Sequence, residues 1–378
     1  MRFFKINRAM RFLVSVLCIL TSCFCFTIRA PKILSILDID FSLVAALTTF
    51  PNGIMFAENS KNKAALKKEN SDNKPKSASS YNETNHNEKK DAELGSESAL
   101  EEPDSPEEIK RHENEKTYKV IETQFGEGGI KFENFYVKNH TKIDLDIAKE
   151  LGTPLDISIK KDGKPEVLIY HTHTTEAYTD KDRGFIYSSY SSRTTDNRFN
   201  VTRVGEEIKE VLESYDISVI HDKTVHDNPS YKGSYWRSLS TIKKNLEKYP
   251  SIQVLLDIHR DSVGEKETGK SKLVSMLNGE KVAQIMILAG CDSGNNDFPN
   301  WRKNLRLALR LQRSTENLCS GMARPLKFDE MELNMSAHPG SLLIEVGTDV
   351  NTIKEACLAG KMLGKSLASV LEDLTKFD

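Results

Sequence analysis

The sequence has little of what marks several common protein classes. Its 378 residues include six cysteines and two tryptophans, and the acidic and basic residues nearly cancel to a formal net charge of −2. Three cysteines lie in an N-terminal apolar segment, so the other three allow at most one disulfide, and no Cys-x-x-Cys zinc pattern joins them. The near-neutral charge and the lack of a recognition motif argue against nucleic-acid binding. No Gly-x-Ser-x-Gly elbow is present, which argues against a serine hydrolase.

The N-terminal region has the pattern of an export signal or a short membrane anchor. Its basic residues are Arg2, Lys5, Arg8 and Arg11. An apolar run over 12–28 follows them. Positive charge ahead of such a run favours a cytoplasmic N-terminus and export of the rest of the chain. No clean small-x-small cleavage site follows the run, so we expect an uncleaved, single-pass anchor in the cell membrane.

Composition divides the rest of the chain into a linker and a body. Residues 58–116 contain almost no branched apolar or aromatic side chains, and they are lysine-rich first and acidic later. Such a segment buries too little surface to offset its ordering entropy, so we expect it to be disordered. It is either a tether or a merely tolerated linker, and its position after an anchor favours the tether. We therefore predict an anchor and juxtamembrane segment over 1–57, a linker over 58–116 and a folded domain over 117–378.

Short apolar runs alternate with segments of helical spacing from Pro165 onward. In one such segment, Val204, Ile208 and Leu212 recur on a single helix face. The predicted strands cover 167–170, 217–220, 252–258, 281–289 and 342–346, and the predicted helices cover 200–215, 234–249, 301–320 and 351–374. This alternation predicts an α/β fold whose sheet is covered by helices on both faces.

The stretch VLIYHTHTTEAY, over 167–178, is the most informative part of the chain. Its first four residues predict a buried strand, which runs directly into His171, His173 and Glu176. Imidazole and carboxylate side chains held by a rigid element are the ligands of a catalytic zinc site. The alternative is a polar loop at a strand end with no chemical role.

Two later strands also end in polar residues. The predicted strand over 252–258 contains Asp257 and is followed by His259 and Arg260, while Glu345 lies at the end of the apolar run Leu342-Leu343-Ile344. In open α/β sheets, ligands bind outside the carboxyl ends of the strands. All three clusters occupy such ends, so we expect them to form one site.

These residue types suggest a zinc hydrolase. Two histidines from different strands and one carboxylate would bind Zn²⁺ and leave a position for water. A further carboxylate, Glu345, would take the proton of that water and pass it to the leaving amine. The alternative for Glu345 is a buried glutamate paired with Arg260. Asp257 either accepts the second ring N–H of a ligating histidine or pairs with an arginine.

Five segments resemble the stage II sporulation protein P family of endospore-forming bacteria. They are VLIYHTHTTEAYTD, DNRFNVTRVGEEI, VIHDKTVHDNPSYKGSYWRS, LLDIHRDS and LLIEVGTDVNTIKEA, in this order along nearly the whole folded domain. The resemblance implies a zinc-dependent N-acetylmuramoyl-L-alanine amidase that hydrolyses peptidoglycan during forespore engulfment. An endopeptidase activity on peptide cross-links is also attributed to the family.

The same resemblance implies a fold, a place and partners. The fold is similar to the wider amidase type 3 group, with a mostly parallel sheet flanked by helices. Residues 117–378 become the catalytic domain, held outside the cytoplasm in the space between forespore and mother cell. Stage II sporulation proteins D and M are the implied partners, besides peptidoglycan and the membrane.

The first two zinc ligands of the wider amidases have more than one match here. Counting from the strand end places His173 at their first histidine and His171 at a proline position. Their second ligand is a glutamate four residues before an asparagine, and Asp196 holds that place relative to Asn200. Glu176 is the local rival. Which of the two histidines and which of the two carboxylates bind zinc therefore stays open.

The remaining positions have a single match each. The third ligand matches His259, and the catalytic glutamate matches Glu345. Two alternatives to an amidase remain: another exported zinc hydrolase of the carboxypeptidase type, or a wall-binding protein that has lost catalysis.

Overall fold

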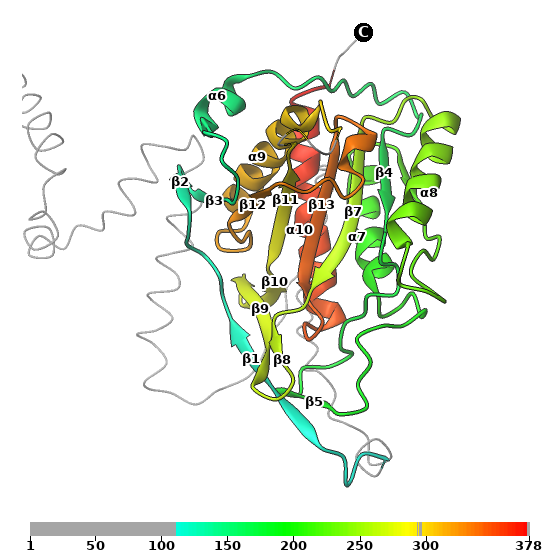
Figure 1. Cartoon of the computed structure of the whole chain (residues 1–378), viewed down its shortest axis with the longest axis vertical. Coiled ribbons are helices and arrows are strands. Elements are labelled where there is room, and N and C mark those ends of the chain that lie inside the picture. The colour runs from blue at the N-terminus through cyan, green and yellow to red at the C-terminus, as the bar shows by residue number, and fades with distance from the viewer. Residues whose placement is uncertain (1–110, 293, 295–296, 376–378) are drawn as a thin grey trace, which may run out of the picture. The chain divides into compact units, whose positions relative to one another are not determined.

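The computed structural model describes residues 111–292, 294 and 297–375 (Figure 1). The predicted anchor over 1–57 and most of the predicted linker, 58–110, lie outside the described residues. Within the described ranges, no helix is both long enough and apolar enough to cross a bilayer. The first strand, β1, begins at Thr117.

The main sheet has eight strands in the order β2-β3-β12-β11-β13-β7-β4-β6. The strands are β2 (Ile130–Phe132), β3 (Phe135–Asn139), β4 (Val167–Tyr170), β6 (Val219–His221), β7 (Val254–Asp261), β11 (Ile285–Gly290), β12 (Leu326–Asp329) and β13 (Ser341–Thr348). The neighbours β13-β7, β7-β4 and β4-β6 are parallel, as are β11-β12 and β12-β3. Only β11-β13 and β2-β3 are antiparallel within the described sheet. The expected mostly parallel sheet is therefore confirmed.

Helices cover both faces of this sheet, as the sequence predicted. They are α6 (Ile147–Gly152), α7 (Val201–Ser214), α8 (Ser234–Lys248), α9 (Trp301–Leu318) and α10 (Ile353–Glu372). In Figure 1, α10 runs behind β13 and β7, and its apolar residues share a core with those of α7 and α9. Helix α8 covers the other face, where Ile242 packs on Leu168 and Tyr170 of β4.

Side chains that cap the helices explain where two of them begin. Asn200 accepts a hydrogen bond from the backbone N–H of Thr202 and starts α7. Thr352 and Glu355 form a reciprocal capping box at the start of α10. Both patterns satisfy backbone N–H groups that have no partner within the first helical turn.

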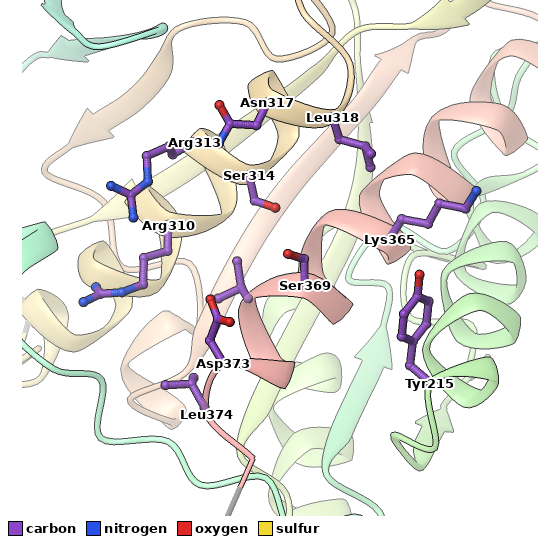
Figure 2. A pocket seen from close by; sticks show the side chains of 11 residues that line it. Tyr215, Arg310, Arg313, Ser314, Asn317, Leu318, Lys365, Ser369, Asp373 and Leu374 are labelled. Atoms are coloured by element: carbon purple, nitrogen blue, oxygen red, sulfur yellow. The ribbon is translucent and has the colours of Figure 1, made fainter. Parts of the chain in front are cut away.

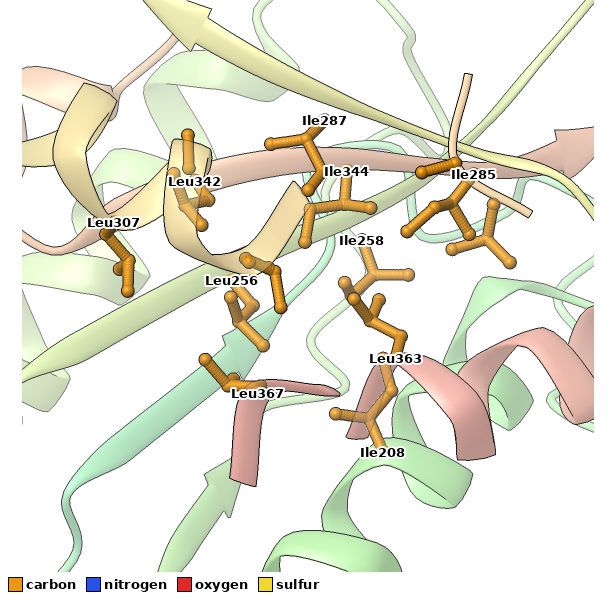
Figure 3. Close-up of a cluster of buried hydrophobic side chains, with 14 of the residues drawn as sticks. Ile208, Leu256, Ile258, Ile285, Ile287, Leu307, Leu342, Ile344, Leu363 and Leu367 are labelled. Atoms are coloured by element: carbon orange, nitrogen blue, oxygen red, sulfur yellow. The ribbon is translucent and has the colours of Figure 1, made fainter. Parts of the chain in front are cut away.

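Alternation along β7 and β13 decides which residues face the cavity described below. Successive side chains of a strand point to opposite faces of the sheet. Ile258 and Ile344 lie in the core beside α10 (Figure 3). The intervening Asp257, His259 and Glu345 therefore lie on the opposite face, which α8 partly covers.

A second, smaller sheet was not predicted from the sequence. It contains β1 (Thr117–Thr123), β5 (Phe185–Tyr187), β8 (Gly264–Glu265), β9 (Gly269–Leu277) and β10 (Glu280–Ala283). The single strand expected over 281–289 is wrong, because β10 and β11 belong to different sheets and are separated at Gln284. The buried Gln284 amide donates to the carbonyl groups of Phe125 and Gly321, which fixes the chain at this crossing.

Lys272 ties this small sheet to the rest of the domain. Its side chain is 1% exposed, and its Nζ lies 2.9 Å from Glu122, 2.5 Å from Asp182 and 3.0 Å from Glu355. Lys272→Met should lower the free energy of unfolding by about 3–5 kcal/mol, because it leaves the buried Glu355 carboxylate without its cation. Denaturant unfolding at neutral pH measures the change.

Lys281 supplies a matched control for that prediction. It pairs with Glu122 and Asp182 as well, but its side chain is 39% exposed. Lys281→Met should cost less than about 1 kcal/mol, since exposed ion pairs contribute little. Equal losses for the two variants would contradict the assigned role of Lys272.

Candidate functional site

A cavity of about 540 Å³ lies where the carboxyl ends of β4, β7 and β13 meet. His173, Glu176, His259 and Glu345 all line it. The structure thus brings together four of the six site residues predicted from the sequence, and they come from three separate strands or strand ends. The convergence of these clusters was expected from the position of ligand sites in parallel sheets.

His259 lies between two carboxylates at the base of the cavity. Its Nε2 is 2.9 Å from Asp257 Oδ1, and its Nδ1 is 3.4 Å from Glu176 Oε2. The contact with Asp257 is an ion pair without hydrogen-bond geometry. Burial alone would lower the pKa of His259, but Asp257 and Glu176 together raise that pKa well above its ordinary value. The two carboxylates therefore favour a positive charge at this point.

Asp257 also fixes the loop that follows β4. Its carboxylate accepts hydrogen bonds from the backbone N–H of Thr172 at 2.8 Å and from the Thr172 hydroxyl at 2.6 Å. A turn follows, in which the N–H of Glu176 donates to the carbonyl of His173 at 3.0 Å. This turn places the His173 and Glu176 side chains at the same cavity.

His173 is held by aromatic and hydroxyl neighbours. Its Nδ1 is 3.2 Å from Ser234 Oγ, and its ring stacks on Tyr231 with centroids 4.4 Å apart. The ring also meets that of His259 edge-on, at a centroid distance of 5.2 Å. Burial lowers the pKa of His173 to about 4, so this imidazole is neutral at physiological pH and free to act as a ligand.

Glu345 is the neighbour of His259 in the register of β13 and β7. Its Oε2 atom is buried and has no hydrogen-bond partner in the described structure. Burial raises the pKa of Glu345 to about 8. The alternative pairing with Arg260 is not seen, because the Arg260 guanidinium donates to the carbonyl groups of Ala177 and Ser192 instead.

His171 and Asp196 lie away from this cavity. The His171 ring is on the α7 side of the sheet, with Nε2 2.9 Å from His221 Nε2 and Nδ1 2.9 Å from the carbonyl of Ile258. The Asp196 side chain is 36% exposed and pairs with Arg198 at 2.6 Å. The turn that follows β4 separates His171 from His173, and it places Glu176, but not Asp196, beside His173 at the cavity.

The cavity also has lining residues that sequence reasoning did not single out. They include Lys138, His140, Tyr231, Tyr235, Lys327 and Leu343. Tyr231 and Tyr235 were visible within the resembling segment NPSYKGSYW, so aromatic residues beside a turn were the available signal. The two lysines had no such signal, because they lie on the distant strands β3 and β12.

The donor set suits zinc in type and charge. Within the described ranges, no three His, Cys, Asp or Glu side chains stand close enough to form a complete metal cage. Two imidazoles and a carboxylate nevertheless line the same cavity, and these are the ligand types that catalytic zinc sites use. Asp257 beside the far nitrogen of His259 matches the outer carboxylate that orients ligating histidines.

Comparison with known proteins gives one extensive match and several partial ones. The family model for stage II sporulation protein P (SpoIIP) matches residues 39–368. The chain is 28% identical over 203 residues to stage II sporulation protein P of Bacillus subtilis (strain 168), an alignment that covers 51% of this chain and 47% of that protein. The chain thus spans about half the length of the curated relative it matches.

Solved structures resemble the chain more distantly. The N-acetylmuramoyl-L-alanine amidase AmiC2 of Nostoc punctiforme is 12% identical and matches 56% of this chain and 97% of its own, with a TM-score of 0.33. The CwlD amidase of Clostridioides difficile, solved in complex with the GerS lipoprotein, is 12% identical and matches 55% and 98%, also with a TM-score of 0.33. Scores of this size carry no argument about activity.

Proposed function

Because this chain belongs to the stage II sporulation protein P family, we propose that it is a zinc-dependent peptidoglycan hydrolase of the N-acetylmuramoyl-L-alanine amidase type. One observation carries the proposal: His173, Glu176, His259 and Glu345 converge on a single cavity. Such a site has the ligands and the additional carboxylate that hydrolysis of an amide needs.

The proposed ligands are His173, Glu176 and His259. Asp257 would keep the His259 ring in one orientation, since it already lies 2.9 Å from its far nitrogen. When bound, a zinc ion would polarise the scissile carbonyl and lower the pKa of the attacking water. His171 and Asp196 are not part of the proposed set, because each has partners outside the cavity.

Glu345 is the proposed general base and acid. The amide that is cleaved joins the lactyl carbonyl of N-acetylmuramic acid to the amino group of L-alanine. Glu345 takes a proton from water as the new C–O bond forms, and delivers it to nitrogen as the C–N bond breaks. The products are a carboxylic acid and a free amine. In the metal-free protein burial raises the pKa of Glu345 to about 8, which favours the step in which it donates the proton to nitrogen.

The cellular setting is also a proposal. We place a single-pass anchor within 1–57, a tether over 58–116 and the catalytic domain over 117–378, outside the cytoplasm between forespore and mother cell. Stage II sporulation proteins D and M are the proposed partners in engulfment, and cleavage of peptide cross-links is a proposed second activity. Family membership and the pattern of the N-terminal residues support this arrangement.

Product analysis tests the proposed reaction. Purified full-length protein incubated with cell-wall sacculi should release whole stem peptides from the glycan, and a zinc chelator should abolish this release. Mass spectrometry of the soluble products separates the outcomes. Release of single amino acids would instead identify a carboxypeptidase, and binding without products would identify an inactive wall-binding protein. Activity that survives complete metal removal would overturn the zinc mechanism.

A further inference from the structure

The wall of the cavity opposite the proposed zinc ligands is cationic. Lys138 of β3 and Lys327 of β12 are direct partners in the register of these neighbouring parallel strands, and both line the cavity. His140 and Arg324 also line the cavity. Glu345 lies on β13, and the proposed ligands lie on β7 or just after β4, so the two lysines border the other end of the cavity.

Few acidic residues neutralise these two lysines. Lys138 has no ion-pair partner in the described part of the chain, and Lys327 has Asp329 at 3.4 Å. Like charges on adjacent strands destabilise a sheet unless something compensates them. Arg324, which also lines the cavity, shows the usual compensation, because it pairs with Asp261 at 2.8 Å. Lys138 is exposed, and Lys327 has one carboxylate at 3.4 Å and the Met331 sulfur at 3.8 Å, so both ammonium groups keep donors for an anionic ligand.

Another pocket gives a useful contrast. It lies between α9 and α10 and is also bordered by cations, including Arg310, Arg313 and Lys365 (Figure 2). Its Arg310 already donates to the carbonyl groups of Leu151 and Thr153, both at 2.7 Å. Cations that hold the fold together in this way do not indicate a ligand, whereas Lys138 makes no such bond.

The register of the sheet fixes the distance between the lysines and the catalytic residues. One row of neighbours runs from Lys138 through Lys327 and Leu288 to Leu343, and Glu345 lies one step further along β13 on the same face. Adjacent strands are about 4.8 Å apart, so the lysine backbones lie roughly 10 and 15 Å from β13. An extended peptide covers about 3.3–3.6 Å per residue, so its third or fourth residue would reach them.

We propose that Lys138 and Lys327 form a carboxylate subsite that binds the acidic stem peptide beyond the scissile amide. The inference rests on the proposed function and adds to it a preference for stem peptides with free carboxylates over amidated ones. The floor between the two ends is apolar, with Leu288 and Leu343, so it would carry the peptide without competing for its charges. Each ammonium group would form charge-assisted hydrogen bonds with a substrate carboxylate.

Paired substrates test this subsite. Two muropeptides are compared, one with free stem-peptide carboxylates and one with the same carboxylates amidated. In the unaltered protein, KM should be on the order of tenfold lower for the acidic substrate, as expected for one or two charge-assisted contacts. The double variant Lys138→Glu with Lys327→Glu should remove this preference or invert it. The double methionine variant, which keeps side-chain length, should remove it without inverting it.

The controls separate a lost subsite from other failures. Lys142→Glu introduces the same substitution once, at an exposed position that does not line the cavity, and it should keep the preference. Calorimetric binding of both muropeptides to Glu345→Gln protein measures the same preference without turnover. If the unaltered protein cleaves neither substrate, the proposed function fails while the binding measurement still tests the subsite. If both substrates are bound and cleaved equally well, the subsite is wrong while the amidase proposal stands.

Discussion

Replacing Glu345 by glutamine should lower the rate of stem-peptide release by about 10²–10⁴-fold, the range contributed by a well-placed general acid or base. Glutamine keeps the shape of the side chain but can neither accept the proton of the attacking water nor return it to the leaving nitrogen. The loss should fall on kcat, since the cavity walls that hold the substrate are unchanged. Rates are measured from stem peptide released by purified protein at a fixed zinc concentration.

The same substitution should leave the stability of the metal-free protein unchanged or slightly higher. Burial raises the folded-state pKa of Glu345 from 4.5 to about 8. A carboxyl with a raised folded pKa costs stability progressively as pH rises above the unfolded pKa, and the cost levels off above the folded pKa. At neutral pH glutamine removes this cost. Thermal unfolding of chelated protein therefore separates a catalytic loss from a folding defect.

Glu166 offers a matched control for Glu345. It is also a buried glutamate whose Oε2 has no hydrogen-bond partner in the described structure. It lies just before the amino end of β4, and it does not line the cavity. Glu166→Gln should keep full activity. Comparable losses in both variants would show that the effect of Glu345→Gln is not chemical.

The sequence predicted most of the elements that carry the site. Val167–Tyr170 is a strand with the predicted bounds, and the helix expected over 200–215 is α7, flanked by its capping residues. These elements have strong local signals, namely apolar periodicity and a side chain that caps the helix. The polar residues at the ends of β4, β7 and β13 could be grouped because parallel strands end at one edge of a sheet.

Other features depend on contacts that are distant in sequence. Strand β1 pairs with β9, and no local sequence pattern predicts this pairing. Strand β11 is antiparallel to β13, so the amino ends of β11 and β12 lie at the cavity. Lys327 could therefore not be predicted from residues at the carboxyl ends of strands. The choice between Glu176 and Asp196 likewise needed the turn that joins Glu176 to His173.

Zinc content should separate the proposed ligands from their sequence neighbours. The unaltered protein should bind about one zinc ion per chain, and His173→Ala, Glu176→Gln and His259→Ala should each reduce this to near zero. His171→Gln and Asp196→Asn should retain zinc, because these side chains lie outside the cavity. Metal analysis after dialysis measures this directly, without reference to turnover.

Replacing Asp257, the carboxylate beside His259, should weaken zinc binding without abolishing it. Asp257→Asn keeps the three ligands but removes the charge next to His259 Nε2, so zinc affinity should fall by about 10–100-fold rather than vanish. Competition with a chelator of known affinity resolves that range.

Far-ultraviolet circular dichroism checks that each variant is folded, which matters most for the buried His171. If His171→Gln loses zinc as fully as His173→Ala while remaining folded, the ligand set proposed from the cavity is wrong. The two histidines of His-Thr-His would then both have to reach the metal, which requires the loop after β4 to depart from the conformation that Asp257 now holds.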